Sequence, residues 1–296
     1  LPYGVAPPRD EVGRWIATRE ERWERIADDD FVALPVGGRE FDPFAAADIN
    51  AELAGSGLVY GAGLGRFRKP HFFLGRLERD EARGAARLLV CGCEYARDVS
   101  AIPAAAQGDT LIVRREALRQ WLWEKAEGWN ARPQDGALKS ALLAYGFAAD
   151  PQGAIERMAD GEIETLALHE EGELAAGRQL GPGWERMIAG LVGKRAEIFA
   201  RAVRDNLADC LVTLPGLLAR GGPDALHFWF ATFEGLRREL FPALATAYAQ
   251  GADRGAAVEQ AARAGRGHFA ALGARLPGMD EKAIEALSHD ARALAL

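Results

Sequence analysis

The chain has 296 residues, with 36 Lys and Arg against 43 Asp and Glu, and therefore a net charge of −7 at neutral pH. Its hydrophobic fraction of 49% is typical of a globular protein and excludes collagen-like, disordered and disulfide-scaffold classes. Charges interrupt each apolar stretch before the roughly 20 residues that a membrane-spanning helix needs. Neither half of the chain has an excess of Lys and Arg, so we expect no nucleic-acid partner and no membrane partner.

Three cysteines are too few and too unevenly placed for a disulfide framework, which favours a reducing compartment and predicts a cytoplasmic location. The chain begins with Leu1 rather than Met, and no basic stretch followed by an apolar run precedes the first elements. We therefore expect no signal peptide in it and a start that has been trimmed.

The first part of the chain mixes helical and strand patterns. After a proline-containing lead-in, Asp10 is expected to cap a helix to about Ala27, with Trp15 and Trp23 on one apolar stripe. The other predicted elements before residue 115 are a strand at 31–36, a helix at 43–54, and strands at 57–60, 71–78, 87–94 and 110–114. Turn signals at Gly61–Gly65 and near residue 84 separate the strands, which indicates an antiparallel meander.

Everything after residue 115 has a helical pattern. The predicted helices include 151–176, 183–219 with breaks near Gly193 and Pro215, 223–250, 255–273 and 280–294. A chain of this length favours two domains. The predicted fold is α+β and mostly α: a small antiparallel β-meander unit in a domain of residues 1–149, followed by an all-α helical bundle of residues 150–296.

A glycine-rich segment, Gly61-Ala62-Gly63-Leu64-Gly65, has the spacing G-x-G-x-G, and an extended pattern follows it. A dinucleotide site needs G-x-G-x-x-G at the start of a helix, so this segment does not predict one. Its backbone amides, together with Arg66, Arg68, Lys69 and Arg97, could bind a small anion. The alternative is a flexible hairpin with a solvated basic strand.

The strongest candidate site lies in the predicted helix 151–176. His169 and Glu173 are four residues apart and share one face with Leu166, a mixture that is unusual for a core and for a surface. Helical bundles use inward carboxylates and imidazoles to bind metals. Asp205 and Asp209, also four residues apart, could complete a set of metal ligands from a facing helix.

This cluster suggests a metal-binding protein with metal-dependent enzymatic activity. Zinc, iron or manganese would be the cofactor, and Glu170 would be the general base. The alternative is structural pairing, in which His169 contacts a neighbouring carboxylate and the two aspartates pair with arginines of their own helix. Those arginines are Arg195, Arg201 and Arg204.

Two other functions remain open. The chain could be a non-catalytic protein that binds a small anion and assembles as a homodimer through its alanine-rich helices. The aromatic residues Phe228, Trp229, Phe230 and Phe233 could instead form a stacking wall for a ring-shaped cofactor, although packing in the core explains them more simply.

Three stretches of the sequence, taken together, carry a resemblance to a protein family. They are residues 59–67 continuing to 69–73, residues 94–98 continuing to 108–110, and the segment His169-Glu170-Glu171-Gly172-Glu173. Together they resemble a family of uncharacterised bacterial proteins of about this length. The resemblance implies a bacterial cytoplasmic protein, and it implies no activity, cofactor or catalytic residue.

Overall fold

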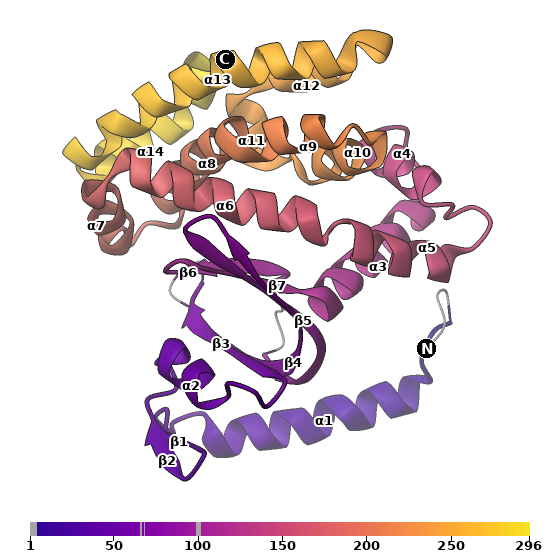
Figure 1. Cartoon of the computed structure of the whole chain (residues 1–296), viewed down its shortest axis with the longest axis vertical. Coiled ribbons are helices and arrows are strands. Elements are labelled where there is room, and N and C mark those ends of the chain that lie inside the picture. Colours follow the sequence, from indigo (N-terminus) through magenta and orange to yellow (C-terminus); the bar gives the residue numbers. More distant parts are fainter. Residues whose placement is uncertain (1–4, 66, 68, 99–101) are drawn as a thin grey trace.

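The computed structural model describes residues 5–65, 67, 69–98 and 102–296 (Figure 1). Seven strands lie in the N-terminal part, and the chain after residue 115 is helical within these residues. The α+β, mostly α fold that the sequence predicts is therefore confirmed.

The N-terminal helix α1 (Arg9–Ile26) ends close to the predicted position, but Asp10 lies in its first turn and does not cap it. None of its residues is buried. Trp15 and Trp23, on its apolar stripe, are about half exposed. A two-stranded ribbon of β1 (Leu34–Val36) and β2 (Arg39–Phe41) follows. Helix α2 (Ala46–Glu52) then packs on one face of the main sheet.

The main sheet contains five strands in the order β3-β4-β5-β7-β6. Their bounds are β3 (Leu58–Leu64), β4 (Pro70–Arg83), β5 (Ala86–Arg97), β6 (Ala104–Gln107) and β7 (Thr110–Arg114). The first three form the predicted antiparallel meander, whereas β7 pairs parallel to β5 and the unpredicted β6 pairs with β7. The sheet curls (Figure 1). Its two edge strands are linked by the side chain of Gln107, which donates to the carbonyl oxygen of Ala62.

The expected turn at Gly61–Gly65 is wrong for most of its length. Residues 61–64 belong to β3 and pair with β4. A Cβ atom at Gly61 would lie 2.0 Å from the ring of Phe73, and one at Gly65 would lie 2.5 Å from the ring of His71. These glycines therefore admit side chains of the neighbouring strand, and residues 61–64 form one arm of the β3–β4 hairpin.

Helices form the rest of the chain. Their bounds are α3 (Arg115–Ala131), α4 (Ala137–Ala144), α5 (Pro151–Gly161), α6 (Ile163–Leu180), α7 (Pro182–Gly190), α8 (Lys194–Ala208), α9 (Leu214–Arg220), α10 (Pro223–Thr232), α11 (Gly235–Leu240), α12 (Pro242–Tyr248), α13 (Arg254–Arg275) and α14 (Glu281–His289). A π-helical segment, Asp209–Thr213, joins α8 to α9. None of the helices in the described ranges is long and apolar enough to cross a membrane.

Helix α6 lies between the sheet and the C-terminal helices, α8 onward (Figure 1). Ile163 and Ala167 pack against the apolar side chains of β5 and β7. Its opposite side contacts α8 and the π-helical segment. The helix that carries His169 is therefore fixed on two sides by packing, which positions its side chains rigidly.

Candidate functional site

The approach of α6 to the end of α8 depends on Gly172. A Cβ atom at this position would lie 2.6 Å from the carbonyl oxygen of Ala208. Because a side chain there would push the helices apart, glycine allows α6 to bring His169 and Glu173 against the residues that follow Ala208.

Asp209 is the first residue of the π-helical segment. Pro215 follows shortly after this segment and has no N–H with which to continue the regular ladder of hydrogen bonds. Single π-helical turns within helices are frequent at functional sites. Here the turn directs a buried carboxylate toward α6.

His169 lies between two carboxylates. Its Nδ1 is 2.9 Å from Oδ1 of Asp209, and its Nε2 is 3.5 Å from Oε1 of Glu173. Trp229 also donates to Oδ1 of Asp209, over 3.3 Å. The imidazole is therefore held at both ring nitrogens.

Two arginines neutralise the same carboxylates. Arg204 Nη2 lies 2.5 Å from Oε1 of Glu173 and 2.9 Å from Oδ1 of Asp205. Arg237 Nη2 lies 2.5 Å from Oδ2 of Asp209. With His169 protonated, three cations face three carboxylates, and the network is neutral.

The pKa values of the network follow from these contacts. Burial alone would lower the pKa of His169, but Asp209 and Glu173 outweigh burial and raise it well above its usual range. Burial alone would raise the pKa of Glu173, yet Arg204 and His169 lower it to about 2. Arg237 and His169 likewise hold the pKa of Asp209 below its usual range, against the effect of burial. The charged forms of all three side chains are favoured.

Glu170 has a different environment. It is 6% exposed, and within the described part of the chain its carboxyl forms no hydrogen bond and no ion pair. Burial, and then the negative charge of Glu173, raise its pKa to about 8. Glu170 therefore holds a proton at a pH where an ordinary glutamate has lost it.

A second buried glutamate on the same side of the fold shows what is unusual about Glu170. Glu162 accepts hydrogen bonds from the hydroxyls of Tyr145, over 2.8 Å, and Thr165, over 2.5 Å. Buried polar groups are normally satisfied in this way. The Glu170 carboxyl lacks such partners, which is typical of a group that is kept for a ligand or for chemistry.

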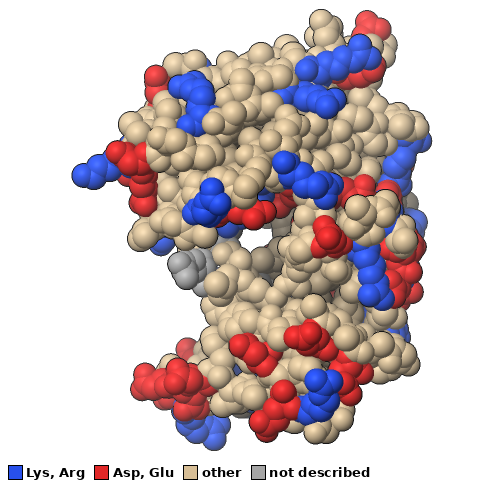
Figure 2. Space-filling view, turned by 60° about the vertical axis from the view of Figure 1, so that its left-hand side comes forward, with Lys and Arg blue, Asp and Glu red and all other residues tan. Residues whose placement is uncertain are grey.

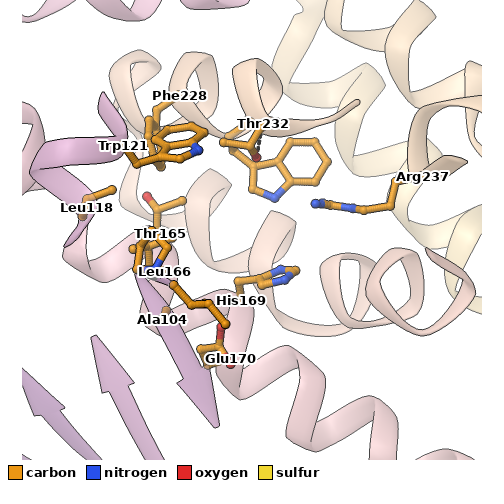
Figure 3. A pocket seen from close by; sticks show the side chains of 13 residues that line it. Ala104, Leu118, Trp121, Thr165, Leu166, His169, Glu170, Phe228, Thr232 and Arg237 are labelled. Atoms are coloured by element: carbon orange, nitrogen blue, oxygen red, sulfur yellow. Dashed lines mark hydrogen bonds between the residues drawn. The ribbon is translucent and has the colours of Figure 1, made fainter. Parts of the chain in front are cut away.

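Glu170 lines a cavity of about 220 Å³ (Figure 3). His169, Arg237 and Thr165 add polar groups to its wall, and Trp121 and other apolar side chains complete it. These apolar residues are Ile102, Pro103, Ala104, Leu118, Leu166, Phe228 and Trp229. A small, mostly apolar pocket with a few convergent polar groups of shifted pKa is the usual form of a ligand or active site.

The molecular surface carries charges of both signs (Figure 2). On the face in Figure 2 the surface is hollowed near its middle, and Lys and Arg side chains are interspersed with Asp and Glu at the edge of the hollow. This face therefore presents no extended region of one charge.

The structure brings together three of the four predicted metal ligands. Ligand atoms of His169, Glu173 and Asp205 lie within 4.8 Å of one another. Asp209 contacts His169 through the other ring nitrogen and lies outside this group. The alternative, pairing of a carboxylate with an arginine of its own helix, also occurs for Asp205: the Arg204 guanidinium bonds to Asp205 and also to Glu173.

The predicted anion site is described only in part. Arg66 and Arg68 lie outside the described residues. Lys69 immediately precedes β4, whereas Arg97 ends β5 opposite Phe73 and lies 3.6 Å from Glu94. Anion binding by these four cations stays a prediction.

The glycines of β3 face a second cavity, of about 210 Å³, beside a second histidine–carboxylate pair. His71 Nδ1 lies 2.7 Å from Oδ2 of Asp98. Gln107 and Arg114 also line this cavity. Sequence reasoning missed this pair because 27 residues separate its members, and only the pairing of β4 with β5 places them together.

Sequence reasoning also missed Arg237 and Trp121 as members of the main site. Both come from helices distant in sequence, and no local pattern marks them. In the aromatic segment 228–233, Phe228 and Trp229 line the cavity. Trp229 also packs with Phe230 and Phe233 in the helical core.

Two family models together cover most of the chain. The N-terminal domain of a family of unknown function (DUF6866) matches residues 1–114, and the C-terminal domain of the same family matches residues 119–295. No curated protein and no solved structure matches the chain. The resemblance of the sequence to an uncharacterised family is thus confirmed, and the chain belongs to the family of unknown function DUF6866.

Proposed function

We propose that the chain is an enzyme that transfers a proton between Glu170 and a small substrate in the cavity beside α6. One observation carries this proposal: Glu170 is a buried residue whose carboxyl opens onto the cavity and has no hydrogen-bond or ion-pair partner in the described part of the chain. Burying an unpaired polar group costs free energy. Catalytic acids and bases have such environments because a pKa near the working pH makes proton transfer efficient in both directions.

The neighbouring charges have supporting roles in this proposal. Both ring nitrogens of His169 face carboxylates, so its imidazole holds a fixed charge beside Glu170 and is not the group that receives the substrate's proton. Arg204 keeps Glu173 ionised, and that negative charge helps to keep the proton on Glu170. Glu170 and Glu173 thus follow the pattern in which two nearby carboxyls are tuned apart for different tasks.

Conversion of small molecules by the full chain tests the proposal. The protein is incubated in D2O with small amines, alcohols and carbonyl compounds, and NMR measures products and deuterium incorporation. We expect Glu170→Gln to lower the rate of any conversion by about 100-fold or more, the usual contribution of a general acid–base group. Glu285→Gln, which removes an exposed carboxylate on α14, is the matched control. Unchanged turnover in Glu170→Gln, or no turnover by the wild type, would contradict an acid–base enzyme.

A metal-dependent enzyme is the second candidate function, favoured by the proximity of His169, Glu173 and Asp205. Imidazole and carboxylate ligands suit zinc, iron or manganese. A bound metal would neutralise the carboxylates in place of Arg204, which now bonds to two of them. Elemental analysis of untagged protein beside His169→Ala distinguishes the two candidates. Stoichiometric metal that is lost in the variant supports a metal centre. Absence of metal from both proteins contradicts a metal centre and supports ion pairing with the arginines as the role of these carboxylates.

Non-catalytic roles are tested separately. Light scattering measures whether the chain forms the homodimer that its alanine-rich helices suggest. A phosphate-dependent thermal shift that is lost in Lys69→Ala and Arg97→Ala would support the small-anion site.

A further inference from the structure

The charges around the cavity determine which ligands it accepts. Among the described residues, three charged or titratable side chains line it: His169, Glu170 and Arg237. His169 and Arg237 both contact Asp209, and the remaining members of the network, Arg204 with Glu173 and Asp205, balance as well. Among the described lining residues, Glu170 is the one whose ionised form would have no counter-charge in contact with it, which is why the empty pocket favours its neutral form.

This imbalance discriminates between cations and anions. An anionic ligand would enter a pocket whose two cations already have Asp209 as counter-charge, although Nε of Arg237 keeps a free N–H. It would also lie beside Glu170 and the carboxylates of the network. A cationic ligand would supply the missing partner for Glu170. In a buried site the energetic difference is large, because an unpaired charge is costly and a hydrogen-bonded ion pair is not.

The other end of the cavity is apolar. Leu166 precedes Glu170 by one turn of α6, about 6 Å along the helix axis, and packs with the cluster that contains Leu118 and Phe228. The rings of Trp121 and Phe228 lie edge to face, with centroids 6.0 Å apart. In Figure 3 this aromatic pair lies at one end of the pocket and Glu170 at the other.

The size of the cavity limits the apolar part of a ligand. A dry cavity of about 150 Å³ accommodates benzene, and this one has about 220 Å³. It therefore has room for a single ring and a short chain.

We infer that the cavity binds a small organic amine, with its ammonium group paired to Glu170 and its ring or alkyl body against Trp121 and Phe228. This inference names the substrate class of the proposed enzyme and rests on that proposed function for its catalytic meaning. The binding itself rests on the unpaired carboxyl, the balanced arginines and the apolar end of the pocket. Other cations of this size with an apolar body share the same chemistry.

Three probes of similar shape and different charge test the inference: 2-phenylethylamine, 2-phenylethanol and 3-phenylpropionate. Isothermal titration calorimetry at pH 7.5 measures binding to the full chain, and quenching of tryptophan fluorescence reports occupancy, since Trp121 and Trp229 line the cavity. The amine is protonated at this pH because aliphatic ammonium groups have pKa values of about 10. We expect the amine to bind at least about tenfold more tightly than the alcohol or the acid.

Variants at Glu170 test whether its carboxyl is the group that binds the ammonium of the amine. Glu170→Gln keeps the shape and removes the charge, and it should weaken amine binding by about 30-fold or more, as when one partner of a buried charge pair is lost. Glu170→Asp should retain the preference for the amine, and Glu285→Gln should leave all three affinities unchanged. The comparison of probes on the wild type stands even if a variant does not fold.

The outcomes separate this inference from the proposed function. Amine-selective binding that Glu170→Gln abolishes supports the inference, and if no amine is turned over it contradicts only the enzymatic proposal. Glu170-dependent turnover of a compound that is not an amine supports the enzymatic proposal and overturns the inference that the ligand is an amine. Equal binding of amine and alcohol, amine binding that survives Glu170→Gln, or binding of none of the probes also overturns it.

Discussion

Glu170 and Glu173 lie within one turn of α6, and their surroundings move their pKa values in opposite directions. Glu173 faces Arg204 and His169, and these cations favour its charged form. Glu170 is a buried residue at the cavity and lies near the negative charge of Glu173; burial first, and then this charge, favour its neutral form. One residue therefore acts as a fixed charge and the other holds an exchangeable proton.

Replacing Glu170 should remove a pH dependence of folding stability. The folded protein holds the Glu170 proton up to a pH of about 8, whereas an unfolded glutamate releases it near pH 4.5. The stabilisation is thus fully present below pH 4.5 and is lost as the pH rises through 8. We expect the stability of the wild type relative to Glu170→Gln to fall by on the order of 3 kcal/mol between pH 4.5 and pH 8.5. Urea unfolding at several pH values measures it, and parallel curves for the two proteins would contradict the assignment.

Replacing Glu173 should have the opposite dependence on pH. Its pKa is lowered, so its contribution is present above about pH 4.5 and is lost as the pH falls toward 2. At pH 7, Glu173→Gln leaves Arg204 with Asp205 alone and should cost about 3 kcal/mol of unfolding free energy.

A double-mutant cycle separates that interaction from general damage. Adding Arg204→Met to Glu173→Gln removes the cation that has lost one of its two carboxylates. The double variant should therefore be more stable than the sum of the single changes indicates. A coupling energy near zero at pH 7 would show that the 2.5 Å contact between Arg204 and Glu173 contributes nothing in solution.

Sequence reasoning found the part of the site that lies on one helix. The spacing of His169 and Glu173 predicts a shared face, and both side chains indeed lie beside Asp205 on α8. It could not find Arg237, because its contact with Asp209 depends on how α11 packs against α8. Helical periodicity specifies which residues share a face, and the identity of the facing helix is a tertiary property.

Strands were predicted well where β-branched or aromatic side chains alternate, and poorly where small residues dominate. The alanines of β6, Ala104 to Ala106, carry little strand signal, so this edge strand was missed. Because glycine favours turns, the sequence pattern predicts a turn at Gly61–Gly65. The pairing of β3 with β4 prevails there, because the missing side chains leave room for rings from the facing strand.

The close approach at β3 leads to a prediction about Gly61. A Cβ atom there would lie 2.0 Å from a ring carbon of Phe73, and this ring is buried with the guanidinium of Arg114 4.4 Å from its centroid. Since neither group can move freely, Gly61→Ala should lower the unfolding free energy by about 2 kcal/mol, as overpacking does elsewhere. Gly13→Ala is the matched control: nothing lies within 4 Å of the added atom, and alanine in a helix should be neutral or stabilise by up to about 1 kcal/mol. Adding Phe73→Leu to Gly61→Ala should restore part of the loss in urea unfolding. If it restores none, contact with the ring is not the reason for glycine at position 61.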